Sequence, residues 1–314
     1  MENSNFMAST SCDVVVVGSC NMDMTVRCRD LPIPGQTILG DSFVTNPGGK
    51  GANQGAAAAK LGARTQIVAR VGNGMFVPRF FQSYDRVGLG HDFVIRDPEI
   101  PSGVALVFVD GEGENMIVVA PGANMRLTPT DVEAAHELIE GAKVLIMQLE
   151  IPLETVIHTA RLAKKSGTTV ILNPAPVRPL PQELLENVDI IVANEVEVMI
   201  LSGAKEVDTS TAAVACRPLI EQGVDHIITT LGKDGAVITS GDGATKVRGF
   251  KVNAIDTTSA GDTFVGALAC ALTEGKSLED ATFFANAAAA LSATKVGAQQ
   301  SMPTREEVDA MLAA

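Results

Sequence analysis

Short apolar runs recur along the chain at the spacing expected of alternating strands and helices. The clearest is Val14–Val17, a continuous β-branched run that ends at Gly18 and indicates a strand buried on both faces. From Thr130 onward, apolar strands alternate regularly with helices, which predicts a doubly wound, mostly parallel sheet. The expected helices there cover residues 131–140, 153–165, 196–201, 210–222, 278–294 and 304–312, and the expected strands cover 144–147, 170–172, 188–192, 226–230 and 250–255.

The first part of the chain predicts a second, smaller sheet. Two apolar segments flank turn-forming residues around Gly111 and Gly113 and therefore predict a hairpin, which could join earlier extended segments in a sheet of its own. A chain of 314 residues can bury a large core, and we expect one α/β domain over residues 1–314. The expected elements are helices at 52–61 and 79–87, a strand at 67–71, and small-sheet strands at 22–27, 36–45, 104–109 and 116–120.

A polar stretch at 256–264 marks the turn from an expected strand into a long apolar helix. Ser259, Ala260 and Gly261 are small and leave open the first amides of that helix, which lack internal partners and carry partial positive charge. An anion could bind there, with the carboxylate of Asp262 beside it. Phosphoryl transfer to a hydroxyl requires such an anion site with an adjacent base. An acidic residue in a first turn can also serve only to stabilise its helix, and spacing alone favours that interpretation.

Several polar residues follow apolar strands, where ligands bind in open α/β sheets. Asn21 and Asp23 share one face if the chain stays extended, and an amide beside a carboxylate suits vicinal hydroxyls. Glu150 follows another strand. Asn194 and Glu197 have the spacing of a helix capping box. A polar loop and an ordinary helix cap would explain all of these residues without a ligand.

A glycine-rich loop at 46–56 precedes the expected helix over 52–61. Its glycines indicate a place where another group approaches the backbone closely. The loop lacks the Ser or Thr of a phosphate-binding Walker A loop, because Gly51 follows Lys50. It lacks the third glycine of a dinucleotide fingerprint, because Gln54 stands at that position.

The run from Asp256 to Asp262 resembles the C-terminal signature of the ribokinase-type carbohydrate kinases, the phosphofructokinase-B family. The Gly48-Gly49-Lys50 run followed by Asn53 resembles the sugar-grasping loop of the same family. Matching motifs occur in matching order from Gly18 to Ser301. The resemblance implies a three-layer α/β/α fold with a small β-sheet lid. It also implies ATP-dependent phosphorylation of D-ribose at its 5-hydroxyl, giving ribose 5-phosphate and ADP, with Mg²⁺ and K⁺ as cofactors.

The resemblance also assigns roles to residues of this chain. Asp262 would be the catalytic base, and the amides of Ala260, Gly261 and Asp262 would form the anion hole. The sugar would be held by Asn21, Asp23, Gly49, Lys50, Asn53, Glu150 and Asp262. The nucleotide would be bound by Asn194, Glu197, Thr230, Gly232, Gly235, Gly261 and Asn286. The potassium ligands would come from Asp256, Thr258, Ser292, Lys295, Gly297 and Ser301.

One segment departs from the family pattern, which leaves two alternatives open. Where the family has a segment resembling Gly-Asp-Asp-x-Phe-Gly, this chain lacks the acidic pair and adds Pro78. The protein could be a family kinase for another acceptor, such as deoxyribose, fructose or adenosine. It could also be a non-catalytic sugar or nucleotide sensor, although an intact Asp262 argues against that.

Composition and charge exclude some classes of partner. A net charge of −13 argues against nucleic acid and anionic membranes. The odd count of five cysteines, with no C-x-x-C pair, argues against a disulfide framework and favours a reducing compartment. Residues 1–11 are polar and do not resemble a signal peptide, so we expect a cytoplasmic protein. The four histidines show no triad or metal spacing. The family resemblance further implies a homodimer formed through the lid.

Overall fold

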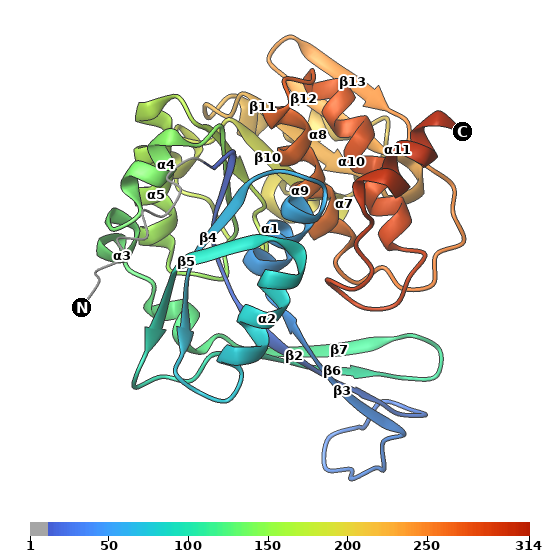
Figure 1. Cartoon of the computed structure of the whole chain (residues 1–314). Coiled ribbons are helices and arrows are strands. Elements are labelled where there is room, and N and C mark those ends of the chain that lie inside the picture. Colours follow the sequence, from blue (N-terminus) through green and yellow to red (C-terminus); the bar gives the residue numbers. More distant parts are fainter. Residues whose placement is uncertain (1–11) are drawn as a thin grey trace, which may run out of the picture.

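Two β-sheets organise the protein, for which a computed structural model describes residues 12–314. The expectation about a signal peptide concerns residues 1–11 and lies outside that range. Within it, nine strands form a large sheet and four form a separate small one (Figure 1). The large sheet runs in the order β13 (Gly243–Val247), β12 (Ala236–Ser240), β11 (His226–Thr230), β10 (Ile190–Asn194), β9 (Thr169–Leu172), β8 (Val144–Met147), β1 (Val14–Val17), β4 (Thr65–Gly72) and β5 (Leu89–Asp97).

The large sheet is parallel from β5 to β11, and β12 alone is reversed, pairing antiparallel with both β11 and β13. Strand β1 pairs with β4 on one side and β8 on the other, with Val14 opposite both Thr65 and Val144. All four valines of β1 are fully buried. The prediction of a mixed α/β fold with a mostly parallel sheet is therefore confirmed.

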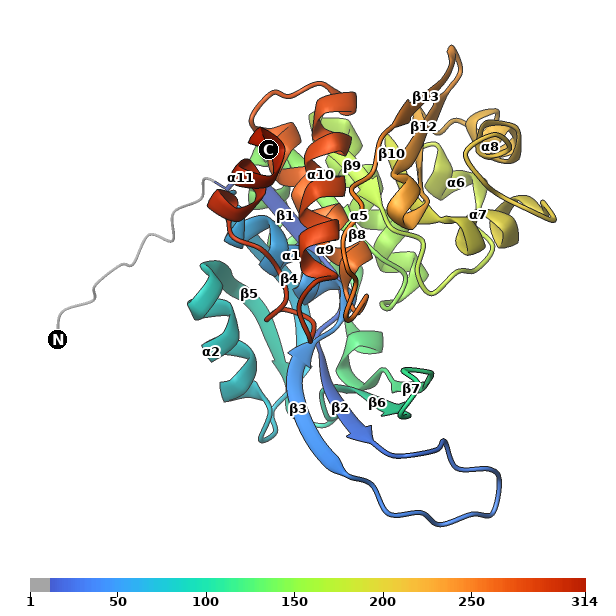
Figure 2. The same cartoon turned by 90° about the vertical axis from the view of Figure 1, so that its right-hand side faces the viewer.

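The small sheet projects from one end of the large one (Figure 2). Its order is β3 (Ser42–Gly48), β2 (Asn21–Arg27), β6 (Gly103–Val109) and β7 (Asn115–Ala120). Strand β1 continues into β2 after only three residues, and β3 continues into helix α1 (Lys50–Lys60) through Gly49. These are two of the short connections that join the small sheet to the rest of the protein, and both carry predicted sugar-site residues.

Helices cover both faces of the large sheet, because alternate side chains of each buried strand point to opposite sides. Val14 and Val16 belong to one core and Val15 and Val17 to the other. The first core contains residues of α1, α2 (Val77–Val87), α9 (Ala260–Thr273), α10 (Leu278–Ser292) and α11 (Arg305–Ala313). The second contains residues of α3 (Pro129–Glu133), α4 (His136–Gly141), α5 (Leu153–Ser166), α6 (Gln182–Leu185), α7 (Glu195–Ser202) and α8 (Ala212–Ile220).

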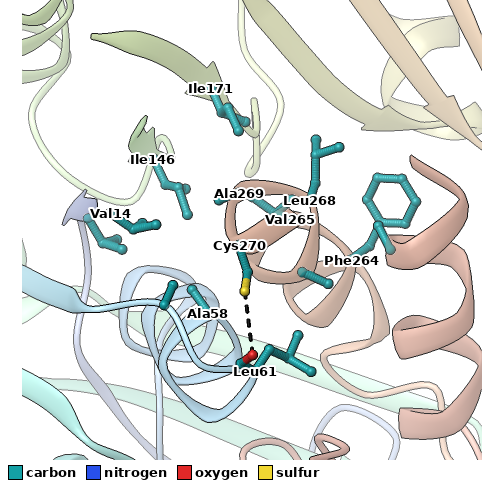
Figure 3. Packing of buried hydrophobic residues seen from close by; sticks show 14 of the residues in the cluster. Val14, Ala58, Leu61, Ile146, Ile171, Phe264, Val265, Leu268, Ala269 and Cys270 are labelled. Carbon is teal, nitrogen blue, oxygen red and sulfur yellow. Dashed lines mark hydrogen bonds between the residues drawn. The ribbon is translucent and has the colours of Figure 1, made fainter. Parts of the chain in front are cut away.

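Helix α9 lies at the centre of the first core, between α1, α10 and the sheet. Figure 3 shows Val265, Leu268 and Ala269 directed toward strand residues. On another side of α9, the Cys270 thiol donates a hydrogen bond of 3.5 Å to the carbonyl of Leu61, just after α1. Gly266 permits the close contact of the two helices, since a Cβ there would lie 2.4 Å from the carbonyl oxygen of Gln54.

The predicted strand at 250–255 is wrong. The sheet edge is formed instead by β13, and residues 248–255 are irregular. Phe250 packs against Phe283 of α10 with ring centroids 5.1 Å apart, and the amide of Ile255 donates to the carbonyl of Ala293. The segment therefore satisfies its apolar and polar groups on α10 rather than on a neighbouring strand.

Other predicted boundaries also differ. The helix expected at 131–140 is divided into α3 and α4, because the amide of Ala135 turns back to Val132 at 2.8 Å. The strand expected at 36–45 is β3, which starts at Ser42. Pro78 lies in the first turn of α2, where its missing N–H leaves no bond unmade. The five cysteines are free, and no helix within residues 12–314 is long and apolar enough to cross a membrane.

We predict that Gly266→Ala destabilises the protein, because its new methyl group would be forced against α1. Overpacking of this kind lowers the free energy of unfolding by about 2 kcal/mol. Urea denaturation of the two proteins would measure the change. Gly141→Ala is the matched control, since nothing lies within 4 Å of a Cβ there. Equal stability of the Gly266 and Gly141 variants would contradict the tight α1–α9 contact.

Candidate active site

The start of helix α9 presents two open backbone amides. Ser259 precedes the helix with φ of 59°, the only non-glycine residue with positive φ in the described part of the chain. The amide of Ala260 donates to the carbonyl of Thr257 at 3.1 Å, and that of Thr263 to the carbonyl of Ser259 at 2.8 Å. The amides of Gly261 and Asp262 have no acceptor among residues 12–314. They carry the positive end of the helix dipole and can receive an anion.

Asp262 is largely buried, with 8% of its surface exposed, and faces a pocket of about 210 Å³. Its two carboxylate oxygens accept from successive residues of α1. Asn53 Nδ2 donates to Oδ2 at 3.1 Å, and Gln54 Nε2 donates to Oδ1 at 3.0 Å. The carboxylate is therefore held next to the open amides of its own helix turn.

The pocket joins residues from distant parts of the sequence. Lys50, Asp262 and Glu197 reach it from the first turns of α1, α9 and α7, and Asn194 and Thr230 reach it from the ends of β10 and β11. These chain ends meet because parallel strands place their carboxyl ends at one edge of the sheet. The remaining lining residues are Asn173, Val192, Ala193, Ser259, Gly261 and Val265.

Lys50 is the cation of this site. Burial acts to lower its pKa, but the negative charges of Asp262, Glu150, Glu197 and Asp23 outweigh burial and raise the pKa. The amine therefore stays protonated across the physiological range. A protonated amine in the pocket of Asp262 can attract a phosphate group.

The glycine-rich loop brings Lys50 against the β1–β2 connection. Gly49 has φ of 91°, and a Cβ there would lie 2.6 Å from the backbone nitrogen of Asn21. Only glycine allows this approach. Glu150 Oε2 accepts from Ser19 Oγ at 2.5 Å, from the backbone amide of Lys50 at 3.2 Å and from Asn21 Nδ2 at 3.4 Å. Glu150 thus links the predicted sugar residues and stabilises the start of α1.

Asp23 lies on β2, on the same face as Asn21. Burial and the charges of Glu150 and Asp262, offset in part by Lys50, raise the pKa of Asp23 to about 7. A Cβ on Gly48 of the neighbouring strand would lie 2.1 Å from Asp23 Oδ2. Glycine at position 48 therefore makes the space that this carboxylate occupies.

Asn53 uses most of the hydrogen-bonding capacity of its side chain within the protein. Its Nδ2 donates to Ser259 Oγ at 3.0 Å as well as to Asp262, and its Oδ1 accepts from Gln299 Nε2 at 3.2 Å. Both donor hydrogens are used. The structure therefore brings Asn53 together with Asp262, and only its oxygen retains spare capacity for a ligand.

The residues predicted to bind nucleotide fall into two groups. Asn194 and Glu197 form the expected capping box of α7, with reciprocal bonds of 2.8 and 2.9 Å. Burial and the charge of Asp262 raise the pKa of Glu197, although the Asn194 amide and Lys50 oppose this. Thr230 ends β11 beside them. Asn286 lies apart on α10, where it donates to the carbonyl of Arg248 at 3.1 Å.

The turn between β11 and β12 depends on two glycines. Gly232 has φ of 54° and Gly235 has φ of 89°. A Cβ on Gly235 would lie 2.2 Å from the carbonyl oxygen of Val247. Neither glycine lines the pocket around Asp262.

The predicted potassium residues form a separate cluster on two segments, 256–258 and 292–301, which the hydrogen bond between Asp256 and Gly297 joins. Asp256 accepts from the amides of Thr258 and Gly297, both at 2.9 Å. Burial acts to raise the pKa of Asp256, but hydrogen bonds from Thr258 and Gly297 outweigh it and lower the pKa. Ser301 is buried and its hydroxyl donates to Ala298 at 2.8 Å, which leaves oxygen lone pairs free. Ser292 and Lys295 are linked by a backbone bond of 3.1 Å.

The oxygen-rich character of this cluster fits a hard monovalent cation, since one carboxylate, backbone carbonyls and hydroxyls are available. No group of three or more His, Cys, Asp or Glu side chains within residues 12–314 is arranged to hold a metal ion.

Comparison with known proteins identifies the family. The family model described as pfkB family carbohydrate kinase matches residues 12–305. The chain belongs to this family. A ribokinase of Bacillus subtilis is 40% identical over 300 residues, covering 96% of this chain and 99% of the relative. A deoxyribokinase of Salmonella typhimurium is 36% identical, covering 96% of this chain and 98% of the relative.

The fold of this pfkB kinase is also that of solved ribokinases. The structure of Arabidopsis thaliana ribokinase complexed with ribose and ATP superposes with a TM-score of 0.89 at 34% identity. The match covers 96% of this chain and 99% of that one. The mostly parallel sheet and separate small sheet are thus shared with a ribokinase.

Several residues around the site of this pfkB kinase were missed in the sequence. Gln54 contacts Asp262, while Gln148 and the pocket-lining Asn173 in turn hydrogen-bond to Gln54. Asn124 donates to Asn21 Oδ1 at 2.7 Å and accepts from the Cys20 amide at 2.8 Å. The only signal for Gln54 was its polar side chain within the glycine- and alanine-rich run of α1.

We predict that Asp23→Asn stabilises the protein at pH 8 but has little effect at pH 4. The raised pKa of Asp23 means that the folded state binds an extra proton between about pH 4 and 7. Stability contributed by this group therefore falls as pH rises through that window, and the penalty is full above pH 7. Asparagine removes the penalty, so urea denaturation should show a gain of up to about 4 kcal/mol at pH 8. A gain that is equal at both pH values would contradict a raised pKa.

Proposed function

We propose that the protein phosphorylates D-ribose at its 5-hydroxyl with ATP, giving ribose 5-phosphate and ADP. The observation that carries the proposal is the carboxylate of Asp262, which faces a pocket beside the open amides of Gly261 and Asp262. Full-length relatives named ribokinase and a matching structure solved with ribose and ATP support the choice of substrates.

In this proposal Asp262 removes the proton from the 5-hydroxyl as that oxygen attacks the γ-phosphorus of ATP. The open amides of Gly261 and Asp262 and the amine of Lys50 stabilise the negative charge on the equatorial oxygens. The family resemblance implies that the Ala260 amide belongs to the anion hole as well. That amide already donates to the carbonyl of Thr257, so only the amides of Gly261 and Asp262 would bind the anion.

The sugar would be held by the β1–β2 connection and the glycine-rich loop. We assign this role to Asn21, Asp23, Gly49, Lys50, Asn53, Glu150 and Asp262. The assignment is supported by their closeness in the structure. Asn21 and the backbone amide of Lys50 both donate to Glu150, and Asn53 donates to Asp262. A carboxylate and an amide on one face of β2 suit neighbouring hydroxyl groups of a pentose.

The nucleotide would enter from the β10 and β11 side of the pocket. Asn194, Glu197 and Thr230 would lie near its phosphates, and Gly232, Gly235 and Asn286 would lie toward its base. Mg²⁺ would accompany ATP, and when bound it neutralises phosphate charge. Glu197 has a carboxylate in the pocket that could orient water around that ion.

We further propose K⁺ at the Asp256 cluster, with oxygens from Asp256, Thr258, Ser292, Lys295, Gly297 and Ser301. The Asp256–Gly297 bond ties this cluster to the segment that leads directly into the anion site. An ion there would neutralise Asp256 and favour one conformation of the turn before α9.

The small sheet would act as a lid and as the contact of a homodimer, within one α/β domain. Its surface carries apolar side chains exposed to solvent, which supports burial against a second copy. They include Phe43, Val44, Leu106, Ile117 and Val118. Five free cysteines support a reducing compartment such as the cytoplasm.

We predict that Asp262→Asn abolishes most turnover while ribose still binds. The substitution removes the general base, so kcat should fall by roughly 10²- to 10⁴-fold. The ribose Kd should change less than threefold, because asparagine keeps the size and polarity of the group. Coupled measurement of ADP release and titration calorimetry with ribose would test both. Parallel loss of turnover and binding would argue against the base.

The same ADP assay on the unchanged protein distinguishes the alternative acceptors. Release should be fastest with ribose and slower with 2-deoxyribose, fructose and adenosine. Faster release with 2-deoxyribose would assign the protein to the deoxyribokinase relatives. No release with any of these sugars would favour a binding protein over a kinase.

We predict that K⁺ activates the protein and that Asp256→Ala removes the activation. Replacing choline chloride by potassium chloride at equal ionic strength should raise kcat by roughly threefold or more in the unchanged protein. It should also raise the thermal midpoint, because an ion that binds only the folded state stabilises it. An Asp256→Ala variant that still responds to K⁺ in both assays would place the ion elsewhere.

A further inference from the structure

Gln54 lies behind the carboxylate of Asp262 and never meets the pocket. It is fully buried on α1, one residue after Asn53. Its Nε2 donates to Asp262 Oδ1 at 3.0 Å and to Asn173 Oδ1 at 3.1 Å. Its Oε1 accepts from Gln148 Nε2 at 2.6 Å. Gln54 therefore cannot touch a substrate, and any effect on the reaction must pass through Asp262.

The direction of this amide chain is fixed by the backbone. Asn173 Nδ2 donates to the carbonyl of Val192 at 3.0 Å, so Asn173 must present its oxygen to Gln54. Gln54 must then direct its N–H groups toward Asn173 and Asp262. The opposite orientation would place its oxygen against two acceptor oxygens. One backbone carbonyl thus determines which group of Gln54 faces the carboxylate.

This row of hydrogen-bonded amides also includes a destabilising feature, a buried oxygen of Gln148 without a hydrogen-bond donor in the described part of the chain, which packing alone does not explain. Gln148 is fully buried, and its Oε1 has no hydrogen-bond donor among residues 12–314. That oxygen lies where a Cβ on Gly18 would approach within 2.1 Å. A buried carbonyl without a donor destabilises the folded state, and an apolar side chain would avoid the loss. Gln148 does, however, hold the oxygen of Gln54.

We propose that Gln54 is a positioning residue that fixes the orientation of the Asp262 carboxylate for proton transfer. Asn53 holds one carboxylate oxygen and Gln54 the other, so rotation of the group would break a bond at either end. Each oxygen keeps a lone pair for the sugar hydroxyl. This inference rests on the proposed role of Asp262 as base, and Gln148 contributes by holding Gln54.

The test is a double-mutant cycle with Gln54→Met, which keeps the length of the side chain but removes both its donors and its acceptor. In the unchanged background kcat should fall roughly 10- to 100-fold, as expected for a misplaced catalytic group. The ribose Kd should change less than threefold. In the Asp262→Asn background the same substitution should lower the residual turnover less than twofold, because the group it orients is gone.

Two further variants complete the experiment. Gln148→Leu should also lower kcat, by a smaller factor than Gln54→Met. It replaces Gln54→Met in the test if that variant does not fold. Thr159→Val is the matched control, since it removes another buried hydrogen bond, 2.6 Å to the carbonyl of Thr155, far from the site. It should leave kcat within twofold.

The outcomes separate this inference from the proposed function. If Asp262→Asn lowers kcat but Gln54→Met lowers it by the same factor in both backgrounds, Gln54 acts independently of Asp262 and the inference is wrong. A loss of ribose affinity in parallel with kcat would equally overturn it. If Asp262→Asn leaves turnover unchanged, the proposed base is wrong, and the role of Gln54 is wrong with it.

Discussion

The contact between helices α1 and α9 determines the geometry of the site. Asn53 and Gln54 leave α1 side by side, and each holds one oxygen of the carboxylate on the first turn of α9. They can do so only because the helices approach closely at Gly266. The same approach brings Lys50, at the start of α1, into the pocket beside Asp262. One tight contact between helices thus places the Asp262 carboxylate, the Lys50 amine and the open amides together.

The site carries many more negatively charged groups than positively charged ones. Four carboxylates, those of Asp23, Glu150, Glu197 and Asp262, act on the single cation Lys50. Two of them respond with raised pKa values, because burial and mutual repulsion disfavour their charge. The site is therefore suited to partners that bring hydroxyl groups or a metal-bound phosphate rather than a free anion. This preference agrees with the sugar site proposed on one side of Lys50 and the nucleotide site proposed on the other.

The sequence predicted the architecture better than the surroundings of the Asp262 carboxylate. Regular alternation of strands and helices was sufficient for the parallel sheet, because each buried strand is locally apolar. The strand expected at 250–255 failed because Phe250 packs on a helix distant in sequence. For the site, the run from Asp256 to Asp262 was visible as a motif. Gln148, Asn173 and Asn124 were not, because their importance comes from hydrogen bonds to residues 94 to 119 positions away in the sequence.

Two of the connections between the small sheet and the rest of the protein have a mechanical consequence. Asn21 begins β2 three residues after β1, and Gly49 separates β3 from α1, so both links pass through the region proposed for the sugar. Any swing of the small sheet must turn at these links as well as at residues 98–102, between β5 and β6, and at the chain that follows β7. Part of the hinge would then consist of the proposed sugar ligands, so that binding the sugar and closing the small sheet over it would be one movement.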